Sequence, residues 1–266
     1  MNPIVRLALE EDIGTGDVTS QACIPESQAA SGRFLAREPL IVAGLGLLEE
    51  IYAHPVTLLK KDGDPCADGE TIATIQAPAR LLLERERVAL NFLQRLSGVA
   101  TLARRFADAV AGTRCRVLDT RKTTPGFRAL EKAAAAAGGV QNHRMGLYDA
   151  ILIKNNHIAA AGGVRAAIER ARAASPLPIE IEVRTRAELR EALDCHAAHL
   201  LLDNLTPLEA AAWVKEIGGR ATVELSGGIT LDAVRAYAEA GADFVSSGAI
   251  THSARAMDIS FRLELL

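Results

Sequence analysis

The sequence predicts an α/β protein in two parts, an N-terminal α/β domain and an α/β barrel. From residue 114 onward, short apolar stretches alternate with amphipathic stretches, which is typical of βα units with a parallel sheet covered by helices. Before that point, helical periodicity is mixed with short β-prone runs and two Asp-Gly turns, Asp62-Gly63 and Asp68-Gly69. We therefore expect an N-terminal domain over 1–97, to which a tail at about 258–266 returns, and a barrel over 98–257.

The N-terminal part closes with a long helical pattern. Apolar residues recur at three-to-four spacing through LLLERERVALNFLQRLSGVATLARRFADAV, as an amphipathic helix requires. Ser97-Gly98 lies in the middle of this pattern, and we expect it to divide the stretch into two helices.

The second part reads as six strands and their helices. The predicted strands are RVLDT, AILIK, IEIEV, LLLDN, TVELSG and FVSSG. The helices between them include GVRAAIERARAA, RAELREALDC, PLEAAAWVKEI and LDAVRAYAEAG. An open doubly wound sheet is the alternative, but no G-x-G-x-x-G follows a first strand.

Composition excludes some classes of function. The formal net charge is −3 and aromatic residues make up 4%, which disfavours a nucleic-acid partner. No apolar run approaches the roughly 20 residues that span a bilayer, and no leader pattern is apparent, so we expect no membrane partner and a cytoplasmic location.

Charged side chains or glycine-rich loops follow every predicted strand. Barrel active sites form at the carboxyl ends of the strands, so these ends are the candidate site. Cations come first, at Thr120-Arg121-Lys122 and Lys154. Carboxylates follow at Glu182 and Asp203, and glycine loops come last.

The cations form a local excess. Residues 120 to 157 hold six Lys or Arg against two Asp or Glu, in a chain whose net charge is negative. With His143 and Arg144, this cluster predicts an anionic substrate, because like charges gathered in a cleft repel unless anions lie against them. The alternative is a solvated basic helix face for Arg128 and Lys132.

The carboxylates predict a metal. Glu182 and Asp203 end neighbouring strands and could hold Mg²⁺ with water and substrate phosphate. Alternatively they are buried ion pairs with Lys154 or Arg144, and both descriptions can hold for the empty protein. Glu180 faces the same side as Glu182 and is either a second acidic wall or an interior ion pair.

The glycine loops predict a phosphate site. Ser226-Gly227-Gly228 precedes a helix expected from Thr230, and Ser247-Gly248 follows the last strand. Exposed backbone N–H groups, hydroxyls and a helix N-terminus would together cradle a phosphate.

Several strings resemble the quinolinate phosphoribosyltransferase family over almost the whole chain. They are LALEEDIGTGDVTS, ERVALNFLQRLSGVAT, DTRKTTPGFRALEK, GGVQNHRMGLYDAILIKNNHI, IEIEV, LLDN, ELSGGI and SSGAITHSA. The resemblance implies Mg²⁺-dependent transfer of phosphoribose from phosphoribosyl pyrophosphate (PRPP) to quinolinate, followed by decarboxylation to nicotinate mononucleotide. It also implies an N-terminal α/β sandwich, an open α/β barrel, and a homodimer, with a higher oligomer left open.

The resemblance also implies residue roles. Arg87 would reach the site of the partner subunit, and Lys122 and Lys154 would face the phosphoribosyl donor. Glu182 and Asp203 would hold the metal. The quinolinate carboxylates would be surrounded by Arg121, His143, Arg144 and Lys154, and the 5′-phosphate by the loops at Ser226, Gly227, Gly228, Ser247 and Gly248. Asn155 departs from the family, where an acidic residue is expected after Lys154.

Three alternatives remain open. The first is a molybdenum-transport-associated paralogue that shares the fold but takes another substrate. The second is a barrel aldolase or isomerase in which Lys154 forms a Schiff base. The third is a protein that binds a metabolite without turnover.

Overall fold

The computed structural model describes all residues 1–266 and divides into two compact units. The first comprises residues 1–104, 124–139 and 254–266, and the second comprises 105–123 and 140–253. The sequence-based boundary placed 98–104, 124–139 and 254–257 with the barrel, whereas their contacts group them with the N-terminal residues. Each unit is described by itself below.

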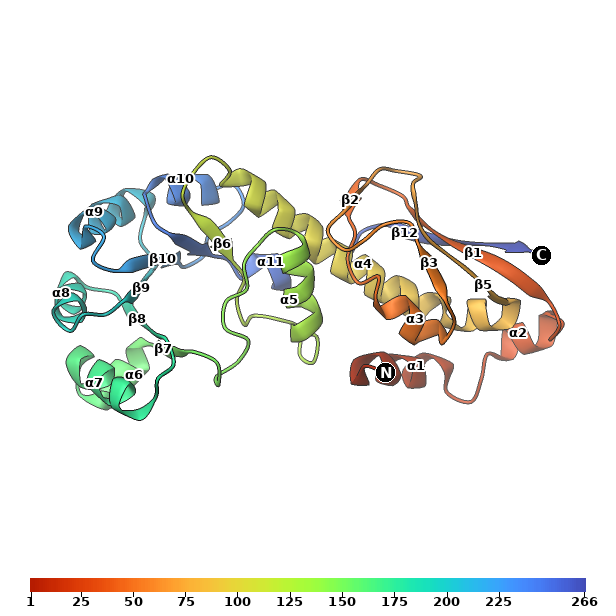
Figure 1. The fold of residues 1–266 in the computed structure, drawn as a ribbon, viewed down its shortest axis with the longest axis horizontal. Coiled ribbons are helices and arrows are strands. Elements are labelled where there is room, and N and C mark those ends of the chain that lie inside the picture. The colour runs from red at the N-terminus through yellow and green to blue at the C-terminus, as the bar shows by residue number, and fades with distance from the viewer. The chain divides into compact units, whose positions relative to one another are not determined.

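The first unit is built on an antiparallel sheet with strand order β12-β1-β5-β3 (Figure 1). These strands are β1 (Ala29–Ala36), β3 (Val56–Leu58), β5 (Thr71–Pro78) and β12 (Ile259–Leu265). A two-stranded sheet joins β2 (Leu40–Ile41) to β4 (Pro65–Cys66). The helices are α1 (Pro3–Ile13), α2 (Val18–Cys23), α3 (Leu47–Tyr52), α4 (Ala79–Ala109) and α5 (Arg128–Ala137).

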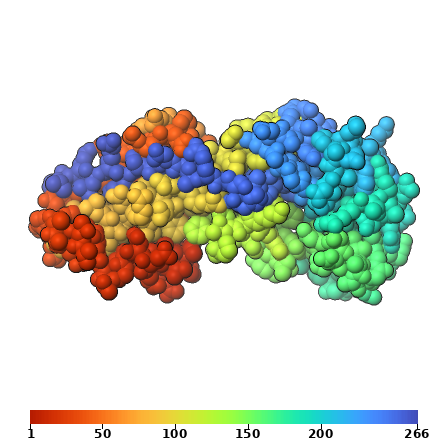
Figure 2. All heavy atoms as spheres, turned by 180° about the vertical axis from the view of Figure 1, so that it is seen from behind, coloured from red at the N-terminus to blue at the C-terminus, as the bar shows by residue number.

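The C-terminal segment completes this sheet. β12 pairs antiparallel with β1 along its whole length, so the last residues lie beside residues 29–36, visible as the dark-blue band beside orange and yellow atoms in Figure 2. The Phe261 ring lies over Gly32, where an added Cβ would meet the ring at 2.1 Å. Phe261 also contacts Phe34 at a centroid distance of 4.9 Å. A glycine inside β1 therefore makes room for the aromatic residue that fixes β12 on the sheet.

The expected break at Ser97-Gly98 is wrong, because α4 runs without interruption from Ala79 to Ala109. Gly98 is needed for packing: a Cβ there would lie 1.9 Å from the carbonyl oxygen of Arg255. The Ser97 hydroxyl accepts a hydrogen bond from the Ala43 N–H at 3.1 Å. Both small residues let neighbouring backbone approach the helix, so a pattern typical of a break serves close contact instead.

The second unit is a six-stranded parallel sheet with order β6-β11-β10-β9-β8-β7. All six predicted strands are confirmed as β6 (Arg116–Leu118), β7 (Ile151–Ile153), β8 (Ile179–Val183), β9 (His199–Asp203), β10 (Thr222–Ser226) and β11 (Phe244–Ser246). The helices are α6 (Asn155–Ala161), α7 (Val164–Ala174), α8 (Arg186–Asp194), α9 (Pro207–Ile217), α10 (Val234–Glu239) and α11 (Ala249–His252). In Figure 1, α7, α8 and α9 lie along one face of this sheet.

The middle strands are apolar and well buried. Ile181, Val183, Leu200, Leu202 and Leu225 are at most 1% exposed. Because parallel strands end at one edge of a sheet, the residues that follow them are brought together there. No helix of the structure combines the length and the apolar character needed to cross a bilayer.

Candidate active site

A cavity of about 790 Å³ lies in the second unit, at the carboxyl ends of its strands. It is lined by every predicted site residue except Arg87, namely Thr120, Arg121, Lys122, His143, Arg144, Lys154, Glu182, Asp203, Ser226, Gly227, Gly228, Ser247 and Gly248. Arg87 is exposed on α4 and does not line this cavity. The strand-end pattern thus brings together groups that are far apart in the sequence.

The segment after β6 is fixed by its neighbours. Asp119 is fully buried and accepts hydrogen bonds from the His143 N–H at 2.8 Å and the Asn142 amide at 2.7 Å. The Lys122 carbonyl accepts from the Thr251 hydroxyl at 2.8 Å, and the Lys122 N–H donates to the Thr120 hydroxyl at 3.1 Å. The backbone that carries the cations is therefore held in place, while the Lys122 side chain remains exposed.

The positive charges of Arg121 and Arg144 repel each other. Burial and the charge of Arg121 lower the pKa of Arg144 from its usual value. The Arg144 Nη1 donates to the Ala150 carbonyl at 2.9 Å, and its buried Nε has no hydrogen-bond partner. Such a half-satisfied cation beside another cation favours an anion in the cavity.

Lys154 lies between β7 and α6 and faces a buried carboxylate. Its Nζ is 3.8 Å from Glu182 Oε2, and its side chain is 51% exposed. The Lys154 N–H donates to His157 Nδ1 at 2.9 Å, so His157 holds the turn that carries the lysine. The expected alternative of an ion pair between Glu182 and Lys154 is therefore present.

Glu182 and Asp203 lie on adjacent strands, and both line the cavity. Glu182 Oε1 is buried and has no hydrogen bond. The Arg184 guanidinium lies 2.7 Å from this oxygen and 3.5 Å from Asp203 Oδ2. Two carboxylates on adjacent strands, one with a buried oxygen that is ion-paired but accepts no hydrogen bond, fit the oxygen ligands that Mg²⁺ prefers.

The two glycine loops are tied to each other. The Ser247 hydroxyl donates to the Ile229 carbonyl at 2.7 Å, so this hydroxyl is engaged within the protein. Gly227 has φ +106°, and a Cβ there would lie 2.4 Å from Asn204 Oδ1. Glycine is therefore required at Gly227, whereas a Cβ on Gly248 would meet only side chains, with Lys122 Cδ at 2.8 Å.

The expected helix start at Thr230 is wrong. α10 begins at Val234, because residues 231–233 form a turn instead of regular helix. α11 follows Gly248 directly but has only four residues. Both loops line the cavity, and neither has a long helix directly behind it.

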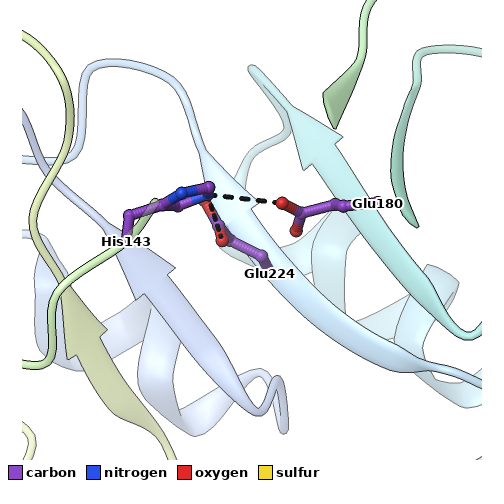
Figure 3. A group of neighbouring side chains, drawn as sticks. All are labelled: His143, Glu180 and Glu224. Atoms are coloured by element: carbon purple, nitrogen blue, oxygen red, sulfur yellow. Dashed lines mark ion pairs between the residues drawn. The ribbon is translucent and has the colours of Figure 1, made fainter. Parts of the chain in front are cut away.

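A second set of charged groups consists of His143, Glu180 and Glu224 (Figure 3). His143 Nε2 lies 3.3 Å from Glu180 Oε2 and 3.4 Å from Glu224 Oε2. Glu180 is therefore part of an interior ion pair, one of the two alternatives left open by the sequence. Glu224 was missed by sequence reasoning, although a glutamate inside the apolar strand TVELSG was a signal for a buried partner.

Ionisation of this cluster is coupled. Burial lowers the pKa of His143, but its contacts with Glu180 and Glu224 outweigh burial and raise it to about 10. Burial also raises the pKa of the Glu180 carboxyl; His143 opposes this and Glu224 adds to it. Only a neutral His143 ring can accept the hydrogen bond from the Arg144 N–H at its Nδ1, at 2.7 Å, so protonation of the ring gives up that contact. Two adjacent carboxylates outweigh that single contact.

The same three residues have a spacing that a metal could use, since their ligand atoms lie within 4.8 Å. A histidine that binds metal through Nε2 carries its proton on Nδ1, where it acts as a donor. Here Nδ1 accepts from Arg144, which leaves the ring proton on Nε2 facing the two carboxylates, so the contacts fit a histidine that donates to Glu180 and Glu224 better than a metal ligand. Glu180, Glu224 and His143 also line a second cavity of about 490 Å³, beside residues that begin the strands, such as Pro178 and Phe244.

Comparison with known proteins yields one consistent family. Residues 17–97 match the N-terminal domain of quinolinate phosphoribosyl transferase, and residues 99–262 match its C-terminal domain. The chain is 42% identical to a probable nicotinate-nucleotide pyrophosphorylase (carboxylating) of Bacillus subtilis, covering 96% of this chain and 90% of that protein. It is 40% identical to the chloroplastic nicotinate-nucleotide pyrophosphorylase (carboxylating) of Arabidopsis thaliana, covering 99% of this chain and 83% of that protein. A crystal structure of NadC from Streptococcus pyogenes superimposes with a TM-score of 0.95 at 37% identity, covering 99% of this chain and 96% of that one.

Proposed function

The chain belongs to the quinolinate phosphoribosyl transferase family, and we propose that it converts quinolinate and PRPP to nicotinate mononucleotide, pyrophosphate and CO₂. This reaction is a step in NAD biosynthesis. The observation that carries the proposal is one cavity lined by seven cationic or histidine groups, three carboxylates and two glycine loops. Quinolinate is a dianion and PRPP carries several negative charges, so both substrates match this lining.

We assign the cations to the two substrates. Arg121, His143 and Arg144 would hold the quinolinate carboxylates, and Lys122 and Lys154 would face the phosphoribosyl donor. The ring nitrogen attacks the anomeric carbon as the bond to pyrophosphate breaks, and pyrophosphate leaves with the electron pair. Carboxylates near the ribose stabilise the positive charge that develops in this transition state.

Decarboxylation then needs little from the protein. The bond between ring carbon 2 and its carboxylate breaks, the electron pair stays on the ring beside the positively charged nitrogen, and CO₂ leaves. The same carbon takes up a proton from water. Orientation of the carboxylate by Arg121 and Arg144 is the main contribution of the chain to this step.

Glu182 and Asp203 are the residues that would hold Mg²⁺. Their oxygen chemistry supports this assignment, as does the buried Glu182 Oε1, which accepts no hydrogen bond. When bound, the ion would neutralise charge on the departing pyrophosphate.

We further propose that the parallel sheet is an open barrel, that the first unit is an α/β sandwich, and that the protein is a homodimer with shared sites. The strand order, with β6 and β7 at opposite ends, supports an open barrel. Arg87 of the partner subunit would complete each site, which its exposure on α4 allows. Mixing two inactive variants, Arg87→Ala and Lys154→Met, tests this, because mixed dimers would regain activity by carrying one intact site. A higher oligomer and a cytoplasmic location stay predictions.

The test is a product assay with purified protein, quinolinate, PRPP and Mg²⁺. We expect nicotinate mononucleotide and CO₂ in equal amounts, with formation lost in EDTA and in Lys122→Ala. Absence of product, together with no binding of quinolinate by calorimetry, would favour the paralogue with another substrate.

A further inference from the structure

Arg184 occupies the space that the proposed function gives to a metal. It follows β8 directly, and its guanidinium lies between Glu182 and Asp203, at 2.7 Å and 3.5 Å. The shorter contact is an ion pair without hydrogen-bond geometry, since Glu182 Oε1 has no hydrogen-bond partner. Arg184 therefore supplies charge to the carboxylate pair without a directed bond to its buried oxygen.

The backbone of Arg184 is anchored, whereas its side chain can move. Its N–H donates to Glu188 Oε2 at 2.7 Å, next to the capping box that Thr185 and Glu188 form at the start of α8. The Arg184 side chain is 45% exposed. The guanidinium can thus swing into solvent without disturbing β8 or α8.

The Glu182 carboxylate, in contrast, is buried and needs a cation beside it. The Glu182 side chain is only 4% exposed, and a buried carboxylate without a positive partner is costly. Its other cation, Lys154, is more distant at 3.8 Å. One half-exposed arginine thus provides the positive charge that a divalent cation would provide more strongly.

Resting on the proposed function, we propose that Arg184 is a resident counter-cation of the Glu182–Asp203 pair, and that a divalent cation displaces its guanidinium on binding there. Arg184 then keeps the metal-free site neutral and lowers its affinity for the ion. Its removal should have two effects: tighter cation binding, and a loss of stability that the cation restores.

The experiment compares Arg184→Gln with Arg190→Gln. Arg190 lies on α8, is 70% exposed, pairs with Glu216 at 3.3 Å and does not line the cavity, so the control removes the same charge elsewhere. Mn²⁺ binding is measured on metal-free protein without substrates, from the electron paramagnetic resonance signal of free Mn²⁺. We expect Arg184→Gln to bind Mn²⁺ about three- to fivefold more tightly than wild type, the size of a partly exposed ion pair, and Arg190→Gln to be unchanged.

A thermal-unfolding series at constant ionic strength gives the second readout. Metal-free Arg184→Gln should melt below wild type, and Mn²⁺ should raise its melting temperature more than that of wild type or Arg190→Gln. Equal or weaker Mn²⁺ binding in Arg184→Gln, or no binding in any form, overturns the inference. Failure of the proposed function is distinguishable, because Mn²⁺ binding is read without quinolinate: tighter binding without product formation would refute the enzyme and keep the counter-cation.

Discussion

Two carboxylate pairs in the same parallel sheet have cationic partners that differ in exposure. Glu182 and Asp203 face the cavity at the strand ends and contact Lys154 and Arg184, whose side chains are about half exposed. Glu180 and Glu224 contact His143, whose side chain is 15% exposed. Glu180 and Glu182 are two residues apart on β8, so both face the same side of the sheet.

The difference shows how neighbouring positions acquire different roles. We call Glu182 and Asp203 the outer pair, and Glu180 and Glu224 the inner pair. The cations beside the outer pair have half-exposed side chains, so one cation can be exchanged for another there, as a binding site requires. The inner pair contacts His143, which backbone hydrogen bonds hold in place, so its partner cannot be exchanged in this way. We therefore expect substitutions at Glu182, Asp203 and their cations to affect turnover, and substitutions at Glu180 and Glu224 to affect folding stability. His143, which also lines the cavity, should affect both.

The largest expected effect is on turnover in Lys154→Met. Loss of the cation beside Glu182 should lower kcat/KM for nicotinate mononucleotide formation about 10²–10³-fold, the usual cost of one transition-state contact. Stability in urea should change by less than about 1 kcal/mol, because the side chain is half exposed. Lys215→Met, at an exposed position of α9, is the control. A decrease in kcat/KM below tenfold would remove Lys154 from the chemistry.

The inner cluster should respond through stability. His143→Ala leaves the buried Glu224 and the partly buried Glu180 without a cation and should lower the free energy of unfolding by about 3 kcal/mol. Glu224→Gln leaves His143 paired with Glu180 and should cost about 1 kcal/mol. Urea unfolding at pH 7 gives both values, and an equal cost for the two variants would contradict a cluster held by its histidine.

Stability should also depend on pH through this cluster. His143 has a pKa of about 10 in the folded chain against 6.5 unperturbed, so the folded state binds more protons between these values. Its contribution is fully present below pH 6.5 and is lost as pH rises through about 10. Between pH 7 and 9 the wild type should lose about 2 kcal/mol more than His143→Gln. Equal slopes in the two proteins would show that the histidine is neutral throughout.

The smallest expected effect is at Asn155. This residue is the first of α6 and lines the cavity beside Lys154, where the family resemblance predicts an acid. A carboxylate at a helix N-terminus is tolerated, so Asn155→Asp should change kcat/KM less than tenfold. A gain above a hundredfold would mean that the amide leaves Lys154 badly paired.

The second unit was the part of the fold that local sequence patterns predicted best. Its strands were predictable because strands buried on both faces of a parallel sheet appear in the sequence as short apolar runs bounded by polar residues. The cavity lining followed, since strand ends must meet at one edge. Arg184 was missed because it lies one residue beyond β8 and reads as the entry to α8. Its role depends on Asp203, which comes from another strand.

Long-range packing limited the prediction elsewhere. Gly98 is needed inside α4 because the carbonyl of Arg255, far along the chain, packs against it, so no window around Ser97-Gly98 contains the reason for this glycine. The inner cluster had a partial signal, because glutamates inside apolar strands need buried partners. The identity of that partner, His143 from a loop, comes only from the three-dimensional arrangement.

The most direct test of the contrast is one pair of isosteric variants on one strand. Glu182→Gln and Glu180→Gln each remove a single charge, and turnover per folded protein is measured for both in the quinolinate assay, alongside urea unfolding. We predict that Glu182→Gln loses at least about a hundredfold in kcat while staying folded, and that Glu180→Gln keeps kcat within about tenfold while its stability changes. Equal losses of kcat in the two variants would contradict the division of roles between the two pairs.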